Sequence, residues 1–303
     1  IRAVGPGTWN SWKGQLLGTL YDAAQERLRL GHKRTGRKER VKAKRKAVAA
    51  LLGEKADIVD TVGALMRDAY WIAEPEDIIA RNIEQYAEAQ RQDDGLSIHC
   101  AVDEERGATL VSVIAQDHPG LFYRIAGGIH LAGANIIDAR VHTASDGTAI
   151  DNFLVQDRNR QPFSEEAQIE RLRKGIRDAL MAKVELVQKL AARPLPHSRS
   201  KTFKIAPSVT FDNEASNRFT VIEVSARDRP ALLNRLAYAL FKANVIIQSA
   251  HFTAYGESAA DTFYVTDPLG AKITSEERLE EIRKALLSAA SDKRQRQLES
   301  AKV

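Results

Sequence analysis

Cysteine and long apolar runs are scarce in this 303-residue sequence. The single cysteine, Cys100, has no second thiol with which to form an intrachain disulfide, and no segment approaches the roughly 18 consecutive apolar residues of a membrane-spanning helix. These absences predict a reducing, cytoplasmic setting and no membrane partner. The first residue is Ile1 and no signal peptide precedes it, so we expect the chain to be a piece of a longer polypeptide.

Motifs of catalysis and metal binding are also missing. The seven histidines never adopt a metal-ligand spacing such as HExxH, and none is followed by aspartate. The sequence contains no P-loop, no GxGxxG fingerprint and no GxSxG elbow. We therefore expect no catalytic residue and no metal or cofactor site in this chain.

The net charge of +5 is small but unevenly placed. Nine Lys or Arg residues lie between Lys33 and Lys46, against one acid, Glu39. Such a run can contact phosphates or an acidic partner, or it can be a solvated helix face or linker. No aromatic side chain is interleaved for base stacking, which disfavours a nucleic-acid partner.

The chain is long enough for two or three domains, and residues 1–95 show helical periodicity. Thr8 is a candidate N-cap for a first amphipathic helix with apolar residues at helical spacing. Further helices are predicted from the basic run to Leu52, from Ile58 to Ile72, and from Pro75 towards Gln92.

An internal duplication follows this helical segment. A shift of 111 residues superimposes eight positions of a first copy on a second, and after Ala144 the best shift is 110, which aligns Asp151 with Asp261. The first eight pairs are Thr109 and Thr220, Val113 and Val224, Ala115 and Ala226, Asp117 and Asp228, Pro119 and Pro230, Leu121 and Leu232, Arg124 and Arg235, and Ala126 and Ala237.

Each copy has the pattern strand, helix, strand, hairpin, strand, helix, with an additional strand before it. The predicted strands of the first copy are 96–103, 108–115, 136–143 and 149–156, and in the second copy Thr274 to Glu277 has the form of a capping box. This pattern predicts an α+β fold with two ferredoxin-like units, each an antiparallel sheet with helices on one face. The expected domains are 1–95 (helical), 96–190 (first unit), 191–206 (linker, with the polar connector 195–201), 207–291 (second unit) and 292–303 (tail).

With catalytic motifs missing, the remaining candidate for a functional site is the turn between the first core strand and the first helix of each copy. Pro119 suits the first helical position, Gly120 allows a ligand to approach the backbone, and free N–H groups at a helix start attract a carboxylate. The carboxylate of Asp117 can hold an ammonium group, so the turn suits a zwitterionic amino acid. The alternative is that Asp-x-Pro is an ordinary helix cap. Asn135 is likewise a ligand contact or a turn residue that tolerates positive φ, while His142 and His251 are expected on strand surfaces.

The segments AQDHPGLFYRIAGGIHLAGANIIDARVHT and SARDRPALLNRLAYALFKANVIIQSAHFTAYGE resemble tandem ACT domains. Together with the opening IRAVGPGTWNSWKGQLLGTLY, they are similar to the C-terminal region of the bacterial bifunctional uridylyltransferase/uridylyl-removing enzymes of the PII signal protein. The resemblance implies a parent with a nucleotidyltransferase domain and an HD hydrolase domain, both dependent on Mg²⁺ or Mn²⁺. It also implies that the ACT pair senses L-glutamine and that the ACT units pair within or between chains.

The resemblance also implies a set of ligand-binding residues in each copy. In the first copy these are Asp117, His118, Gly120 and Leu121, with Asn135 and Ile136 across the cleft. In the second they are Asp228, Arg229, Ala231 and Leu232, with Ile246 and Ile247 opposite. Because the second copy has Ala231 for the glycine and Ile246 for the asparagine, we expect the first copy to be the better ligand site. Three alternatives stay open: a sensor of another amino acid, a PII-docking or dimerisation module without ligand, and a nucleic-acid contact through the basic run.

Overall fold

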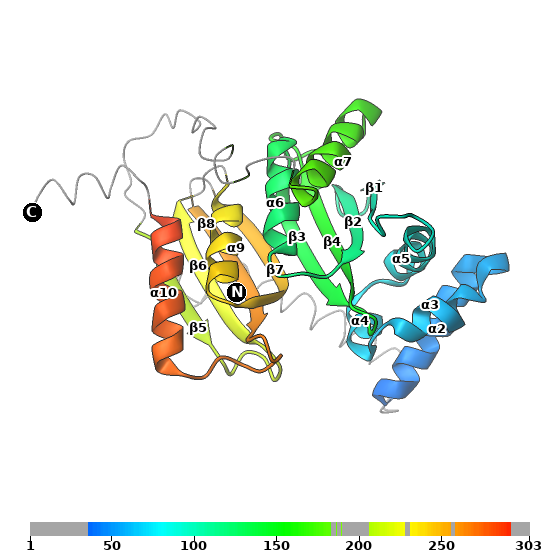
Figure 1. Ribbon diagram of the computed structural model, residues 1–303, viewed down its shortest axis with the longest axis horizontal. Helices are drawn as coiled ribbons and strands as arrows, with labels where there is room; N and C mark the ends of the chain where they lie inside the picture. The colour runs from blue at the N-terminus through cyan, green and yellow to red at the C-terminus, as the bar shows by residue number, and fades with distance from the viewer. Residues whose placement is uncertain are drawn as a thin grey trace, which may run out of the picture. The chain divides into compact units, whose positions relative to one another are not determined.

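The computed structural model describes residues 36–182, 186, 189, 206–227, 231–255 and 258–291. It consists of two compact units, one made of the residues up to Gly95 with the turn Thr143–Thr148, the other of Leu96–His142 and Ala149 onwards (Figure 1). The predicted helix that begins at Thr8 and the connector 195–201 lie outside the described residues. Among the helices that are described, none is long and apolar enough to cross a membrane.

The first unit is helical. Its helices are α2 (Arg37–Leu52), the 3-10 turn η1 (Gly53–Lys55), α3 (Ile58–Leu65), α4 (Asp68–Ala73) and α5 (Glu76–Ala89). The prediction of one helix from Ile58 to Ile72 was wrong, because Met66 has an extended backbone with φ −79° and ψ 132° that ends α3. Pro75 directly precedes α5 as its N-cap residue. Tyr70, Trp71 and Ile83 are among the largest buried side chains of this unit.

Two cations of the basic run take part in the packing of the helical unit. The Lys44 ammonium donates to the backbone carbonyl of Glu74, and the Arg45 guanidinium donates to the carbonyl of Gly63 at 2.9 Å. The same guanidinium lies 5.0 Å from the centroid of the Trp71 ring, a cation–π distance. The basic run is therefore partly structural, whereas five of its cations in α2 remain exposed: Arg37, Lys38, Arg40, Lys42 and Lys46.

The turn Thr143–Thr148 is held within the helical unit by Tyr86 of α5. The Tyr86 hydroxyl donates to the Asp146 carboxylate and lies 3.2 Å from the Thr148 hydroxyl, while the Thr148 N–H donates to Asp146 at 3.0 Å. Burial, followed by the Asp146 contact, raises the pKa of Tyr86 to about 12. Burial acts to raise the pKa of Asp146, but the hydrogen bonds from Tyr86 and Thr148 outweigh it and lower that pKa.

The second unit contains one eight-stranded sheet. Its order is β1-β2-β4-β3-β7-β8-β6-β5, so the two copies of the duplication lie side by side and join at β3 and β7. The strands of the first repeat are β1 (Ser97–Asp103), β2 (Ala108–Gln116), β3 (Asn135–Thr143) and β4 (Thr148–Gln156). Those of the second are β5 (Ser208–Asp212), β6 (Thr220–Arg227), β7 (Ile246–Tyr255) and β8 (Ser258–Thr266). The α+β prediction of two ferredoxin-like, ACT-type units is confirmed.

Four helices complete the two repeats: α6 (Leu121–Leu131) and α7 (Glu166–Leu180) in the first, α9 (Leu232–Lys242) and α10 (Glu276–Ala290) in the second (Figure 1). The expected capping box at Thr274 was wrong. The N-cap of α10 is Ser275, whose hydroxyl accepts from the Arg278 N–H, and an arginine at that position cannot return a hydrogen bond as an acceptor.

One apolar core runs beneath the helices of both repeats. It includes Val113, Ile125 and Phe153 of the first repeat and Ile222 and Phe263 of the second, all exposed by 1% or less. Period-two alternation in the strands and 3.6-residue periodicity in the helices produced this single buried layer.

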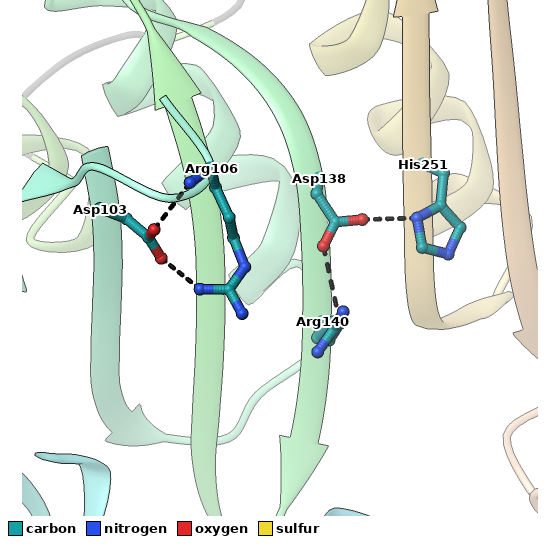
Figure 2. A network of polar contacts seen from close by, with 5 residues as sticks. All are labelled: Asp103, Arg106, Asp138, Arg140 and His251. Atoms are coloured by element: carbon teal, nitrogen blue, oxygen red, sulfur yellow. Dashed lines mark hydrogen bonds and ion pairs between the residues drawn. The ribbon is translucent and has the colours of Figure 1, made fainter. Parts of the chain in front are cut away.

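The junction between the repeats is short at the level of the backbone. Strands β3 and β7 are antiparallel, and their register pairs Asp138 with His251, Ala139 with Ala250, and Arg140 with Ser249. Figure 2 shows the Asp138 carboxylate between His251 Nδ1, at 2.5 Å, and Arg140 Nε, at 3.6 Å. His251 is therefore a half-buried residue of the junction, and the predicted pairing of ACT units occurs within the chain.

Above the sheet, helices α6 and α9 also contact each other across the junction. The buried Asn234 amide of α9 donates to the Tyr123 carbonyl of α6 at 2.7 Å. The Tyr123 ring packs against Tyr238 and Phe241, with centroids 5.3 and 5.2 Å apart. The helices thus add an aromatic contact and a hydrogen bond to the three residue pairs that join β3 and β7.

Candidate ligand-binding site

The turn between β2 and α6 is an exposed loop that leads into an uncapped helix. Asp117, His118 and Pro119 are exposed, and Gly120 is the N-cap residue of α6 with φ 88° and no side-chain hydrogen bond to the helix start. Pro119 therefore does not occupy the first helical position, as the sequence had suggested. The left-handed Gly120 turns the chain after the proline, so the helix begins at Leu121. The N-cap residue is thus Gly120 and not Asp117.

Gly120 is required by conformation and by space. A Cβ atom at this position would lie 2.6 Å from the Tyr123 ring and 3.2 Å from the Phe241 ring. The glycine therefore admits neighbouring aromatic rings, one of which comes from the other repeat. This differs from the expected purpose of the glycine, which was to let a ligand approach the backbone.

The strand register separates Asn135 from the Asp117 turn. In the second repeat, Arg227 at the end of β6 pairs with Ser258, which also pairs with Tyr255 at the end of β7. Ile246, at the start of β7, pairs with Thr266 at the other end of the sheet. The turn after β6 and the start of β7 are thus at opposite ends.

The first repeat has the same strand order, and the 2.7 Å hydrogen bond from the Ser112 hydroxyl to Asn152 fits the same register between β2 and β4. Asn135 and Ile136, at the start of β3, consequently lie at the end opposite to Asp117. The prediction that they face the Asp117 turn across one cleft was wrong, because a first core strand and the strand after its helix run parallel in this fold.

Because β3 and β7 are antiparallel, the strand that starts beside the Asp117 turn belongs to the other repeat. Ile246 and Ile247 begin β7 at the end of the sheet where β3 finishes, which is also the end of the Asp117 turn. Phe241, which touches the Gly120 position, lies in the last turn of α9 just before this strand. The structure therefore groups Asp117, His118, Gly120 and Leu121 with Ile246 and Ile247.

By the same symmetry, Asn135 and Ile136 lie at the end of the sheet where β6 finishes. Asp228 and Arg229 of the turn after β6 lie outside the described residues. Ala231 and Leu232 are buried, and Ala231 is the N-cap of α9 with φ 63°, in the left-handed conformation that Gly120 adopts in the first repeat. The second copy therefore keeps the left-handed N-cap conformation although it has lost the glycine.

Three residues near the first turn were missed as site residues. Tyr123 and Phe241 are contributed by helices of different repeats, and no local motif marks them. Asp151 was noticed only because the duplication aligns it with Asp261, and both are buried acids in strands that otherwise alternate apolar residues. A carboxylate at a core-facing position of such a strand was the available signal.

Asp151 is exposed by 1%, and neither of its carboxylate oxygens makes a hydrogen bond of good geometry among the described residues, although the His142 backbone lies close enough to act on its pKa. Burial, and then the neighbouring Asp117 carboxylate, raise the pKa of Asp151 well above its usual range, while the His142 backbone acts in the opposite direction. In the described part of the chain, no group of three or more His, Cys, Asp or Glu side chains could hold a metal ion.

Comparisons with known proteins identify relatives over nearly the whole chain, although no family model matches it. The chain is 66% identical over 301 residues to the bifunctional uridylyltransferase/uridylyl-removing enzyme of Erythrobacter litoralis, which covers 99% of this chain and 33% of that protein. The protein of the same name from Novosphingobium aromaticivorans is 62% identical over 294 residues, and the one from Zymomonas mobilis is 44% identical. The chain spans about a third of the length of these relatives. The chain therefore corresponds to one part, about a third, of a bifunctional uridylyltransferase/uridylyl-removing enzyme, and this part includes an α+β region with two ferredoxin-like repeats.

Proposed function

We propose that this chain is the glutamine-sensing regulatory region of a bifunctional uridylyltransferase/uridylyl-removing enzyme and that it controls the modification of PII. The observation that supports the proposal is the position of the Asp117–Leu121 turn, where Gly120 lies against Phe241 of the other repeat and the start of β7 lies at the same end of the sheet. A ligand bound there contacts both repeats. Its binding therefore depends on how the repeats are arranged.

The chemistry of the turn favours an α-amino acid. The Leu121 N–H donates to the His118 carbonyl, but the next N–H groups of α6 have no side-chain cap and can bind a carboxylate, while the exposed Asp117 carboxylate can bind an ammonium group. Ile246 and Ile247 begin β7 at the same end of the sheet, where Ile247 belongs to the apolar core and Ile246 is exposed. The glutamine amide is not read by Asn135 at this site, because Asn135 lies at the opposite end of the sheet.

Control of the parent enzyme follows from linkage. Glutamine shifts the activities only by the difference between its affinities for two arrangements of the repeats. In this proposal, the transferase and hydrolase chemistry, with its Mg²⁺ or Mn²⁺, belongs to other domains of a longer cytoplasmic parent, and PII is their substrate. In this proposal the present chain supplies the sensor.

Calorimetric titration of the 303-residue chain with L-glutamine tests the proposal, with L-glutamate as the matched control. We expect saturable binding of glutamine and weaker binding of glutamate, because only glutamine has a neutral side-chain amide. A second titration with Ile246→Asp, which places an acid opposite the turn on an exposed side chain, is expected to weaken binding. Absence of heat with glutamine, or equal affinity for the two amino acids, contradicts the assignment.

Light scattering distinguishes the remaining alternative. A docking or dimerisation module without a ligand predicts association of chains that does not change with glutamine. A sensor whose repeats pair internally through β3 and β7 predicts that glutamine acts on a single chain.

A further inference from the structure

The strongest unexplained feature outside the predicted site residues is the Asp151 carboxyl group. Ala149 and Phe153, two residues before and after it on β4, belong to the apolar core beneath the helices. Because side chains alternate along a strand, Asp151 points to the same helix-covered face. Its side chain is buried there, and neither oxygen makes a hydrogen bond of good geometry among the described residues.

The position of Asp151 along β4 places it below the Asp117 turn. Phe153 packs on Phe122 of the first turn of α6, with ring centroids 5.6 Å apart. Asp151 is two residues closer to the start of β4, which is the end of the sheet where β2 delivers Asp117. The proximity of the two carboxylates is reflected in the effect of Asp117 on the pKa of Asp151.

A buried carboxyl group without a partner is costly, and a core position of this kind is ordinarily filled by an apolar side chain. Asp261 occupies the equivalent position of β8 and is also buried, with an exposure of 5%. Its neighbour Phe263 packs on Phe252 in the core. A partner that is present only some of the time would explain why an acid occupies the Asp151 position.

We propose that Asp151 is a binding residue for the ammonium group of the amino acid, which it holds together with Asp117 beneath the start of α6. This inference rests on the proposed function and deepens it by naming the group that recognises the α-amino nitrogen. A primary ammonium has three N–H donors and one positive charge, so it satisfies an oxygen of each carboxylate at once. The α-carboxylate of the same ligand then binds the uncapped N–H groups of α6.

Access requires a movement of the turn. Asp117, His118 and Pro119 are exposed, whereas the Asp151 carboxyl is enclosed. The ligand therefore reaches Asp151 only when the turn is displaced from β4. That displacement transmits the presence of the ammonium group to α6 and to its contacts with α9.

The test compares two ligands on the wild-type chain and on Asp151→Asn. The ligands are L-glutamine and 4-carbamoylbutanoate, which is glutamine without its α-amino group. We expect Asp151→Asn to lower the affinity for glutamine by about tenfold or more, as for the loss of one charge-assisted contact, and to leave the affinity for 4-carbamoylbutanoate within about twofold. Circular dichroism and thermal unfolding establish that the variant is folded.

The outcomes separate the two proposals. Glutamine binding by the wild type with equal affinity for Asp151→Asn overturns the role of Asp151 and leaves the glutamine sensor standing. An equal loss for both ligands shows a structural role and also overturns it. If the wild type does not bind glutamine, both proposals fail.

A measurement without a variant covers the case in which Asp151→Asn does not fold. The ¹³C resonance of the Asp151 carboxyl group is followed by NMR in the wild-type chain. It is expected to shift on saturation with glutamine and not with 4-carbamoylbutanoate. An unchanged resonance with both ligands contradicts the proposal.

Discussion

The two repeats share one topology but differ at the positions where their helices begin and pack. The first has glycine at the left-handed helix start and a glycine pair, Gly128 and Gly175, where α6 crosses α7. The second has Ala231 in the same left-handed conformation, and Ala239 and Ala285 at the positions of the glycine pair. The same backbone plan is therefore achieved with closer helix contact in the first repeat and with larger side chains in the second.

This difference shows that a duplicated fold can keep a left-handed backbone conformation at a position where glycine has been replaced by alanine. A non-glycine residue in the left-handed region costs roughly 1 kcal/mol. Ala231 accepts that cost, while the tightly packed Gly120 also makes room for Tyr123 and Phe241. Changes at matched positions of the two repeats, at a buried acid and at the junction test this comparison.

The largest effect is expected at the glycine pair of the first repeat. A Cβ atom at Gly128 would lie 2.7 Å from the Gly175 carbonyl oxygen and 2.7 Å from the Ile176 Cα, which are backbone atoms that cannot rotate away. Gly128→Ala is therefore expected to lower the free energy of unfolding by about 3 kcal/mol, in spite of the better helix propensity of alanine. Urea unfolding followed by circular dichroism measures it.

The matched change in the second repeat is Ala239→Gly. It removes one methyl group and adds backbone freedom to a helix, for an expected loss of about 1 kcal/mol. If Gly128→Ala is neutral or stabilising, the two helix pairs are packed alike and the comparison between the repeats does not hold.

The second effect concerns the buried carboxyl of the first repeat. Since the pKa of Asp151 is raised in the folded chain, the folded state binds more protons than the unfolded state at pH values between the two pKa values. Stability is therefore lost as the pH rises from the unfolded pKa towards the folded pKa, by about 1.4 kcal/mol per pH unit in that window. Asp151→Asn is expected to abolish this loss, as measured by urea unfolding from pH 4 upwards.

Glu105→Gln is the control for this experiment, because Glu105 is an exposed carboxyl in the turn between β1 and β2. It is expected to retain the wild-type dependence on pH. If the stability of Asp151→Asn depends on pH as the wild type does, another titrating group is responsible.

The third prediction exchanges the residues at the two left-handed helix starts. Gly120→Ala introduces both a strained φ of 88° and a close contact with Tyr123, so we expect a loss of about 1 kcal/mol or more. Ala231→Gly relieves a φ of 63° and is expected to gain about 0.5 kcal/mol. Thermal unfolding is expected to show a lower stability for Gly120→Ala and a higher stability for Ala231→Gly. A gain of stability from Gly120→Ala would contradict the packing argument.

The smallest effect is expected at the junction in Figure 2. Asp138→Asn removes the charge between His251 and Arg140, both partly exposed, and is expected to cost less than about 1 kcal/mol. Hydrogen exchange is expected to increase at the β3–β7 junction, at the amides of Ala139 and Ala250. Asp103→Asn, which breaks the Asp103–Arg106 pair within one repeat, is the control and is expected to leave those amides unchanged.

The elements of the sheet were predictable from the sequence to within a residue or two. Alternation of apolar residues located β2, β3 and β4, since the face of a strand is fixed by a period of two residues. The break between α3 and α4 at Met66 and the start of α10 at Ser275 were not predictable, because tertiary packing decides where a continuous apolar pattern bends and which of two adjacent hydroxyl residues caps a helix.

The sequence by itself determined that the chain is a duplication, that each copy carries an Asp-x-Pro turn at Asp117 or Asp228, and that none of the catalytic motifs considered accompanies it. Only the tertiary structure decided which residues meet. The order of residues in the sequence does not reveal that β7 pairs with β3 in the antiparallel direction. It therefore could not show that Ile246, and not Asn135, lies at the same end of the sheet as the Asp117 turn. Nor could it show that Asp151 is enclosed below that turn, because burial depends on the helices and strands that converge on a position from distant parts of the chain.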